Sequence, residues 1–370
     1  MTYHNIKFIF FFAIIAVVSC TTPTSGTRGD STRSKSDKEP VIRVLIAENK
    51  LVLLLTISGD FTLKAPEGSY VFNPEQSGIK ISNKNNELVF SSESRSMKFQ
   101  SGTKIFFIPR DQSNSFSVNG ISYDEKIEIV LENGNISIVS LLPLEKYLTG
   151  VVPNEIPSYN RSGYEAVKAQ AIAARTYALK RMAIRSDNLF HVYGDHRDQV
   201  FNGLVNRSKL ATDAVIETKG EVLFYKDKPI DASYHSTSGG ITEDYASVWG
   251  DTTRPYLPVQ YDAIDEVLSS ESPYNRWQFS FSPGTIEKKL YKWLKLSLPD
   301  NKSDRYYKER TVSMKISERT KGLRVNQLRV QAGEYELILN SRQIRQFLAN
   351  EEGRNLPSRL FTIVREKGDF

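Results

Sequence analysis

Residues 126–141 read Lys126-Ile-Glu-Ile-Val-Leu-Glu-Asn-Gly-Asn-Ile-Ser-Ile-Val-Ser-Leu141. Two runs rich in β-branched residues flank an Asn-Gly pair, and Asn-Gly is typical of the tight turns that join antiparallel strands. The pattern therefore predicts a hairpin of two strands, Lys126–Leu131 and Ile136–Leu141.

The sequence upstream of this hairpin also favours strands. Short β-branched or aromatic runs are separated there by Gly, Pro, Asn and Ser. They predict five strands, at Val41–Ala47, Leu51–Ile57, Ser69–Phe72, Lys104–Ile108 and Ser115–Val118.

Downstream of the hairpin the pattern changes. Glu165–Met182 is rich in Ala and free of Gly and Pro, which predicts a helix, and Ser208–Thr218 predicts a second one that Gly220 closes. The remaining predicted elements are strands Glu221–Tyr225, Ile230–Tyr234, Trp277–Phe281 and Val312–Ile316, a hairpin over Leu323–Leu339, and helices Ile286–Leu294 and Ser341–Ala349. Because these elements do not alternate as βαβ units, we predict an α+β fold, mostly antiparallel β-sheet with an inserted helical region.

Composition excludes several classes of protein. The chain has 370 residues, 39% of them hydrophobic, enough for one large or two modest packed domains. Its net charge of +6 favours anionic surroundings, but no block of five like charges and no nucleic-acid motif is present, so we expect no nucleic-acid partner. One cysteine excludes a disulfide framework and a cysteine-rich zinc module.

That cysteine ends an apolar N-terminal stretch. Residues 8–19 carry no charge, but they are too few to cross a bilayer, which takes about 20 residues. The length suits an export signal, and Val17-Val18-Ser19-Cys20 resembles a bacterial lipobox, in which the cysteine is lipidated. We predict a signal peptide at 1–19 and a lipid anchor on Cys20; the alternative is an ordinary signal with an incidental cysteine. Thr21, rather than Asp, favours the outer membrane, facing the periplasm, if the cell has two membranes.

Composition also predicts how the mature chain is divided. Residues 21–40 contain no aliphatic or aromatic side chain, so 20–40 is expected to be a flexible tether that follows the lipidated cysteine. We predict a β-rich part at 41–140 and a catalytic part at 141–370.

Glu155 is the first candidate for chemistry. It lies in Val151-Val-Pro-Asn-Glu-Ile-Pro157, where the prolines are expected to hold the backbone extended. Apolar neighbours disfavour an ionised carboxyl, which raises its pKa toward the range of a general acid. The alternative is a surface glutamate in a proline-rich loop.

Lys168 and Arg175 are the second candidate pair. They are seven residues apart on the predicted helix and therefore share one face, where two cations suit an anionic or polar ligand. The alternative is a pair of solvated surface charges.

The third candidate is Tyr234-His-Ser-Thr-Ser-Gly-Gly240. Hydroxyls beside Gly239 and Gly240 suit a loop whose backbone N–H groups face a ligand. A serine hydrolase is disfavoured because no Gly-x-Ser-x-Gly motif is present and neighbouring residues of a strand point to opposite faces. His191 and His196, with Asp195 and Asp198, lack a metal-binding spacing, so a polar loop is expected there.

Taken together, these segments resemble the stage II sporulation protein D family, which includes the amidase-enhancer proteins of bacterial cell walls. The resemblance covers most of residues 41–370 and is carried by an ordered series: Val41–Leu45, Leu142–Pro157, Ala166–Tyr177, Gln199–Gly203 and Ser233–Gly240. The Pro-x-Glu-x-Pro motif paired with the Lys-Ala-Gln-Ala helix is its specific part.

The resemblance implies a peptidoglycan lytic transglycosylase that cuts MurNAc–GlcNAc bonds of glycan strands lacking stem peptides, in cell-wall remodelling. The family's catalytic glutamate falls on Glu155, and the lysine and arginine of its motif fall on Lys168 and Arg175. Substrate contacts are also expected from loop residues Tyr234, Ser236, Ser238, Gly239 and Gly240.

Two departures from the family pattern matter. Members that hold zinc carry cysteine just before the Gln-Val motif, whereas Tyr193–Asp198 has none, so we predict no metal and no cofactor. Members also continue into a Gly-His-Gly-containing segment near where Glu366–Phe370 ends this sequence, so that segment is expected to be missing. This favours an alternative function, a non-catalytic envelope lipoprotein that binds glycan and enhances an amidase partner.

Overall fold

The computed structural model describes residues 39–73, 78–93, 95–158, 161–250, 252–263, 272, 274–295 and 312–365. The predicted signal peptide, Cys20 and residues 20–38 of the tether lie outside the described residues, as does the C-terminal Glu366–Phe370. Within the described ranges, no helix is long and apolar enough to cross a membrane.

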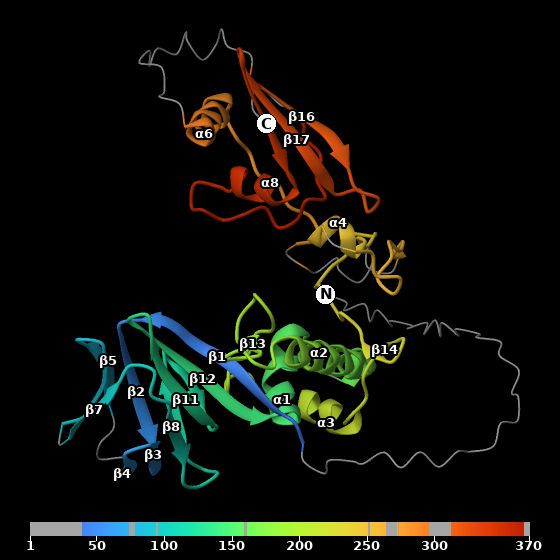
Figure 1. Ribbon diagram of the computed structural model, residues 1–370. Helices are drawn as coiled ribbons and strands as arrows, with labels where there is room; N and C mark the ends of the chain where they lie inside the picture. The colour runs from blue at the N-terminus through green and yellow to red at the C-terminus, as the bar shows by residue number, and fades with distance from the viewer. Residues whose placement is uncertain are drawn as a thin grey trace, which may run out of the picture. The chain divides into compact units, whose positions relative to one another are not determined.

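A seven-stranded sheet forms one layer of the fold (Figure 1). Its strands, in spatial order, are β13 (Val192–Tyr193), β1 (Val41–Lys50), β12 (Asn135–Pro143), β11 (Lys126–Glu132), β8 (Ile105–Pro109), β3 (Phe61–Ala65) and β4 (Gly68–Phe72). All neighbours pair antiparallel except β1 and β13, which pair parallel.

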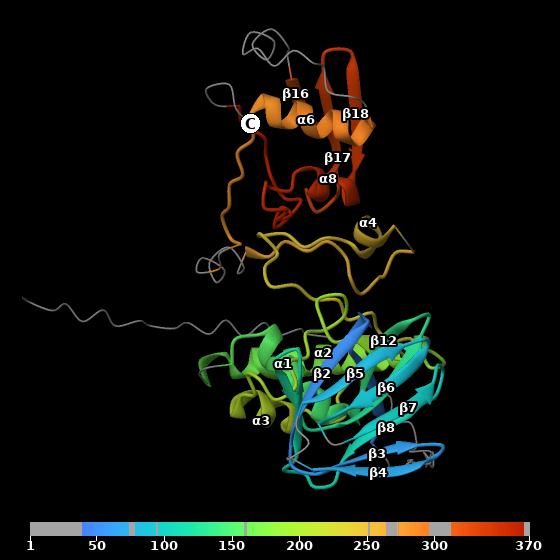
Figure 2. The ribbon, with the colours of Figure 1, turned by 90° about the vertical axis from the view of Figure 1, so that its left-hand side faces the viewer.

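A six-stranded antiparallel sheet forms the second layer. Its order is β10 (Ile121–Tyr123), β9 (Ser115–Val118), β2 (Val52–Ser58), β5 (Ile79–Lys84), β6 (Glu87–Ser91) and β7 (Ser96–Gln100). Figure 2 shows β2, β5, β6 and β7 side by side. Along β2 buried and exposed residues alternate, as expected for a strand with one face on a core.

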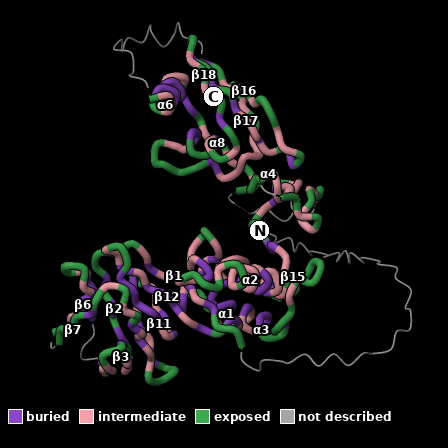
Figure 3. The backbone as a smooth tube through the Cα atoms, in the orientation of Figure 1, coloured by how far each residue is buried: buried purple, intermediate pink, exposed green. Residues whose placement is uncertain are grey.

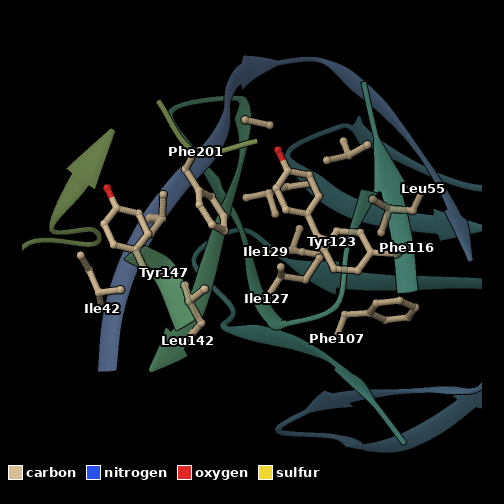
Figure 4. Close-up of a cluster of buried hydrophobic side chains, with 14 of the residues drawn as sticks. Ile42, Leu55, Phe107, Phe116, Tyr123, Ile127, Ile129, Leu142, Tyr147 and Phe201 are labelled. Atoms are coloured by element: carbon tan, nitrogen blue, oxygen red, sulfur yellow. The ribbon is translucent and has the colours of Figure 1, made fainter. Parts of the chain in front are cut away.

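Three helices pack together beside the sheets: α1 (Leu144–Glu155), α2 (Tyr164–Ile184) and α3 (Lys209–Glu217), with a 3₁₀ turn, η2, at Arg161–Gly163. One hydrophobic core continues from both sheets into these helices. Figure 4 shows the connection, in which Phe116, Tyr123, Phe201 and Tyr147 follow one another with ring centroids 5.3–6.0 Å apart. The sheets and the helices are therefore one packed unit, and the core leads directly to α1.

The C-terminal residues have a core of their own. It is built on α6 (Pro283–Leu294), α8 (Ser341–Phe347) and an antiparallel sheet of β16 (Val312–Arg319), β17 (Val325–Ala332) and β18 (Tyr335–Asn340). The chain between the two cores carries a short hairpin, β14 (Phe224–Tyr225) with β15 (Lys228–Pro229), and α4 (Tyr245–Trp249). Figure 3 shows buried residues in both sets of elements.

The predicted α+β class, with mostly antiparallel sheet, is confirmed. The predicted hairpin is β11 and β12, and its turn residues Asn133 and Gly134 have φ of 51° and 78°, as a type I′ turn requires. The predicted boundary between 140 and 141 does not separate two cores, because β12 and α1 belong to the same one.

Three strand predictions need correction. Trp277–Phe281 forms no strand; its aromatic residues alternate inward and pack on the C-terminal core, and no strand of the described residues pairs with it. The predicted strand Glu221–Tyr225 shrinks to the two-residue strand β14, and Ile230–Tyr234 forms no strand. Positive φ at Lys226 and Asp227 places the turn earlier, so the partner strand β15 ends before Ile230.

Candidate active site

Glu155 is the last residue of α1. The prediction of an extended backbone on both sides of it was wrong at Pro153, which lies inside the helix. Burial of residues such as Tyr147 and Val151 on this helix outweighs the hydrogen bond that proline removes. The prediction holds at Ile156, whose φ of −140° and ψ of 138° end the helix before Pro157.

The loop 199–206 is fastened to the end of α1. Asn154 Nδ2 donates to the Gly150 carbonyl at 2.7 Å, and Asn202 Nδ2 donates to Asn154 Oδ1 at 3.1 Å. The Val200 N–H donates to Glu155 Oε1 at 3.0 Å. The carboxyl of Glu155 is therefore held by a loop that begins 44 residues later in the chain.

Burial is the largest influence on the Glu155 carboxyl and raises its pKa above the ordinary range. Hydrogen bonds from the Val200 N–H and the Tyr234 side chain act in the opposite direction and lower it. The side chain remains partly exposed. The site thus offers a carboxyl that retains a proton more readily than usual and that solvent or a ligand can reach.

Tyr234 belongs to a series of buried hydrogen bonds centred on Gln199. Gln199 Nε2 donates to the Tyr234 hydroxyl at 3.1 Å and to the Ala174 carbonyl at 3.3 Å, and Gln199 Oε1 accepts from the Tyr147 hydroxyl at 3.2 Å. Gln199 is completely buried. The series joins α1, α2, the 199–206 loop and the Tyr234 segment around Glu155.

Asp198, one residue earlier, is engaged in the fold. Its carboxylate accepts from the Tyr177 hydroxyl at 2.6 Å and the Tyr193 N–H at 2.9 Å, and it pairs with Arg185 at 2.6 Å. Its side chain is 1% exposed. Because donors surround this carboxylate, it is not free to act as a second catalytic acid or base.

Arg175 has a different position from the one expected of a glycan contact. Its side chain is 1% exposed. Its five N–H donors all reach acceptors, which lie on α1, on α3 and in the residues that directly follow α3. Two bonds go to Glu145, at 2.9 and 2.7 Å. As a correction to the sequence-based expectation, Arg175 stabilises the packing of the three helices and has no donor left for a sugar.

Lys168 lies on the same face of α2, as predicted, but nearer solvent. Its Nζ is 2.8 Å from Glu165 and 3.9 Å from Glu217, and its side chain is 25% exposed. The structure therefore separates the two cations that the sequence placed together: Lys168 is reachable and Arg175 is not.

The Ser-Thr-Ser-Gly-Gly segment forms a loop with positive φ at Gly239 and Gly240, of 69° and 88°. Ser236 is exposed, whereas the Ser238 hydroxyl is buried and hydrogen-bonds Asp262 at 3.0 Å. Ser238 therefore shapes the loop, and Ser236 is the hydroxyl open to a ligand.

Arg324, the residue before β17, holds this loop. Its guanidinium donates to the Ser238 carbonyl at 2.6 Å and the Thr242 carbonyl at 2.9 Å, and also to the Ile241 carbonyl. This contact could not be expected from the sequence, because Arg324 is 86 residues from Ser238.

The histidines do not gather into a metal site. His191 lies against Arg43, whose Nε is 3.1 Å from the ring, while His196 is exposed and Asp195 pairs with Arg197. Among the described residues, no group of three or more His, Cys, Asp or Glu is arranged to hold a metal ion.

Two cavities lie away from Glu155. One of about 710 Å³ is lined by residues of α4 and of the β16–β17 turn, including Trp249. Another of about 640 Å³ is lined by residues of the C-terminal core such as Trp277. Neither cavity is lined by Glu155 or by the residues that hold it, and we place the chemistry at Glu155.

Comparison with known proteins finds similarity in the part of the chain that contains Glu155 and Gln199. Residues 132–225 match the family model described as stage II sporulation protein. The stage II sporulation protein D of Bacillus subtilis is 32% identical over 167 residues, which are 41% of this chain and 47% of that protein. An uncharacterized protein of Brachyspira hyodysenteriae is 30% identical over 221 residues, 59% of this chain and 57% of that protein.

A third relative carries a different name. The amidase enhancer of Bacillus subtilis is 35% identical over 144 residues, 38% of this chain and 18% of that protein. The chain spans about half the length of the first relatives it matches. Residues 132–225 of this chain therefore form a domain of the stage II sporulation protein family, and this segment contains Glu155, Lys168, Arg175 and Gln199.

Proposed function

We propose that the protein is a peptidoglycan lytic transglycosylase that cleaves MurNAc–GlcNAc bonds of glycan strands, with Glu155 as its catalytic acid and base. The observation that carries the proposal is the environment of this one carboxyl, which is half-buried, has a raised pKa and lies at a surface-accessible helix end.

The position of Asp198 supports a lytic reaction over hydrolysis. A glycoside hydrolase normally uses two carboxyl groups that flank the bond. Asp198, which directly precedes the 199–206 loop that holds Glu155, is buried among Tyr177, Tyr193 and Arg185. A single carboxyl suffices when the sugar supplies its own nucleophile.

Water is not a reactant in the proposed reaction, and all atoms of the substrate are found in the products. Protonated Glu155 gives its proton to the glycosidic oxygen as the bond from C1 of the muramic sugar breaks, and GlcNAc leaves with a free hydroxyl. The C6 hydroxyl of the muramic sugar then bonds to C1, and its proton passes to the Glu155 carboxylate. The product has a 1,6-anhydro end, and Glu155 is protonated again for the next cycle.

The Val200 N–H and the Tyr234 hydroxyl stabilise Glu155 between its two proton transfers. Both donate to Glu155, so they stabilise the carboxylate that remains after the first proton transfer. We assign glycan contacts to the residues that are at least partly exposed: Tyr234, Ser236, Gly239, Gly240 and Lys168. Ser238 and Arg175 are buried, and we assign them a supporting role.

The alternative function is a glycan-binding protein that enhances an amidase. The similarity to the amidase enhancer of Bacillus subtilis favours it. In both cases we propose an exported protein that is anchored in the cell envelope through a lipid on Cys20. Substituting Cys20→Ser tests the anchor: the protein should leave the membrane fraction, and unchanged fractionation would contradict the anchor.

Purified glycan strands without stem peptides test the enzymatic proposal. The wild-type protein should release 1,6-anhydro ends, detected by mass spectrometry, and Glu155→Gln should release them at least about 10²-fold more slowly. Glu334→Gln, the same change at an exposed turn between β17 and β18, is the matched control and should retain wild-type activity. Glycan binding without cleavage by the wild type would favour the amidase-enhancer alternative.

A further inference from the structure

Gln199 occupies a position in which its amide can be oriented in one way only. Amide nitrogen and oxygen are distinguished by their hydrogen-bond partners. The backbone carbonyl of Ala174 only accepts, so the amide atom 3.3 Å from it must be the nitrogen. The amide oxygen then faces the Tyr147 hydroxyl, 3.2 Å away, and Tyr147 must be the donor in that bond.

The same constraint reaches Tyr234. Of the two protons on Gln199 Nε2, one goes to Ala174 and the other to the Tyr234 hydroxyl, 3.1 Å away. A phenol has one proton of its own. Because Tyr234 accepts from Gln199, its own proton is free to point to the other side, where Glu155 lies.

We infer that Gln199 is a positioning residue that directs the phenol proton of Tyr234 toward Glu155. Gln199 is completely buried and lies behind Tyr234 in the series, so it acts through Tyr234 and does not contact the glycan. The inference rests on the proposed function for its consequence in catalysis, but the order of the hydrogen bonds can be tested without any activity.

The arrangement also determines where the proton of Glu155 resides. Two donors, the Val200 N–H and the Tyr234 O–H, already face the carboxyl. A proton held by Glu155 must therefore lie away from both of them.

The first test compares three variants by the pKa of Glu155, measured by NMR of carboxyl groups labelled with carbon-13. Tyr234→Phe removes the donor, so the pKa should rise by on the order of one pH unit. Gln199→Met removes the amide and should shift the pKa in the same direction. The double variant should equal Tyr234→Phe, since Gln199 acts through Tyr234.

Tyr147→Phe is the matched control, because it removes the donor on the far side of Gln199 and leaves the Ala174 constraint in place. It should leave the pKa of Glu155 unchanged in the same NMR measurement. A Glu155 pKa that stays at its wild-type value in Gln199→Met, while Tyr234→Phe raises it, would overturn the inference.

Neutron diffraction from the deuterated wild-type protein avoids the risk that a buried substitution fails to fold. Deuterium between Tyr234 and Glu155, with the amide deuterium of Gln199 directed at Tyr234, is the expected result. Deuterium between Tyr234 and Gln199 on the phenol side would overturn the inference. If the hydrogen bonds are as expected but the wild type releases no anhydro ends, the positioning stands and the proposed function fails.

Discussion

Arg175 and Glu145 meet inside the helical layer through two hydrogen bonds, of 2.9 Å from Nε to Oε1 and 2.7 Å from Nη2 to Oε2. The guanidinium is 1% exposed and the carboxylate 17%. Such a two-point pair fixes both side chains in direction as well as distance. It ties the first turn of α1, the helix that ends in Glu155, to the middle of α2.

Breaking the pair of Arg175 and Glu145 should lower the stability of the fold rather than the affinity for glycan. Glu145→Gln leaves a buried guanidinium without its counter-charge, a loss of about 3–5 kcal/mol in comparable buried pairs. Arg175→Ala should destabilise by a similar amount. Urea unfolding followed by circular dichroism measures this, and a midpoint equal to that of the wild type would show that the pair does not support the fold.

Lys168→Ala should have the opposite effect, with little change in stability and weaker binding to glycan. Its ion pairs are at the surface, where salt bridges contribute little to stability, so the urea midpoint should stay near that of the wild type. If Lys168 contacts the glycan, binding to glycan strands should weaken, and more so at low salt. Binding that is identical to wild type at low salt would remove Lys168 from the site.

Gly203 tests how the 199–206 loop is held. Its φ is 55°, and a Cβ there would lie 2.2 Å from the Ser122 carbonyl. Gly203→Ala should therefore lower the free energy of unfolding by about 2 kcal/mol or more. Gly220→Ala is the control, because φ there is 78° but a Cβ would meet nothing within 4 Å, so only the backbone cost of about 1 kcal/mol applies. Equal losses in the two variants would contradict the close contact.

Glu125 predicts a pH dependence of stability. Burial, followed by the hydrogen bond and charge of Asp124, raises its pKa from 4.5 to about 8, although Lys146 and Arg207 act against this. The folded state thus holds this proton more tightly than the unfolded chain does. The free energy of unfolding contributed by Glu125 is therefore highest below pH 4.5 and falls as the pH rises toward 8.

Removing the carboxylate should remove that fall. Glu125→Gln should gain stability relative to the wild type as the pH is raised from 4.5 to 8, measured by thermal unfolding across that range. Glu132→Gln, at an exposed position of the hairpin, should leave the slope unchanged. A variant that retains the wild-type slope would show that Glu125 does not titrate in this range.

Local patterns of the sequence predicted the elements whose determinants are local. The β11–β12 hairpin follows from Asn133-Gly134, and α2 from its alanines. Strands such as β5 and β7 were missed because lysine and serine interrupt their apolar pattern. Helix α1 was missed because Pro153 argues against a helix locally, while burial against the shared core overrides it.

Some features of the candidate site could likewise be predicted from the sequence, and others could not. The raised pKa of Glu155 could be expected from its apolar neighbours in the sequence, and burial is its largest cause in the structure. The role of Arg175 could not, because its partners Glu145 and Thr218 lie 30 and 43 residues away. The Gln199-Val-Phe-Asn-Gly203 motif was recognised, but the function of its first residue depends on Ala174 and Tyr234, which only the fold brings together.

The central claim is that Glu155 alone cleaves the glycan without water, and digestion in water enriched in heavy oxygen tests it most directly. The account predicts that purified glycan strands yield 1,6-anhydro ends that carry no heavy oxygen at C1, analysed by mass spectrometry. It also predicts that Glu155→Gln yields almost none of them. Products with heavy oxygen at C1 would identify a hydrolase and contradict the account, as would the same unlabelled products from Glu155→Gln at the wild-type rate.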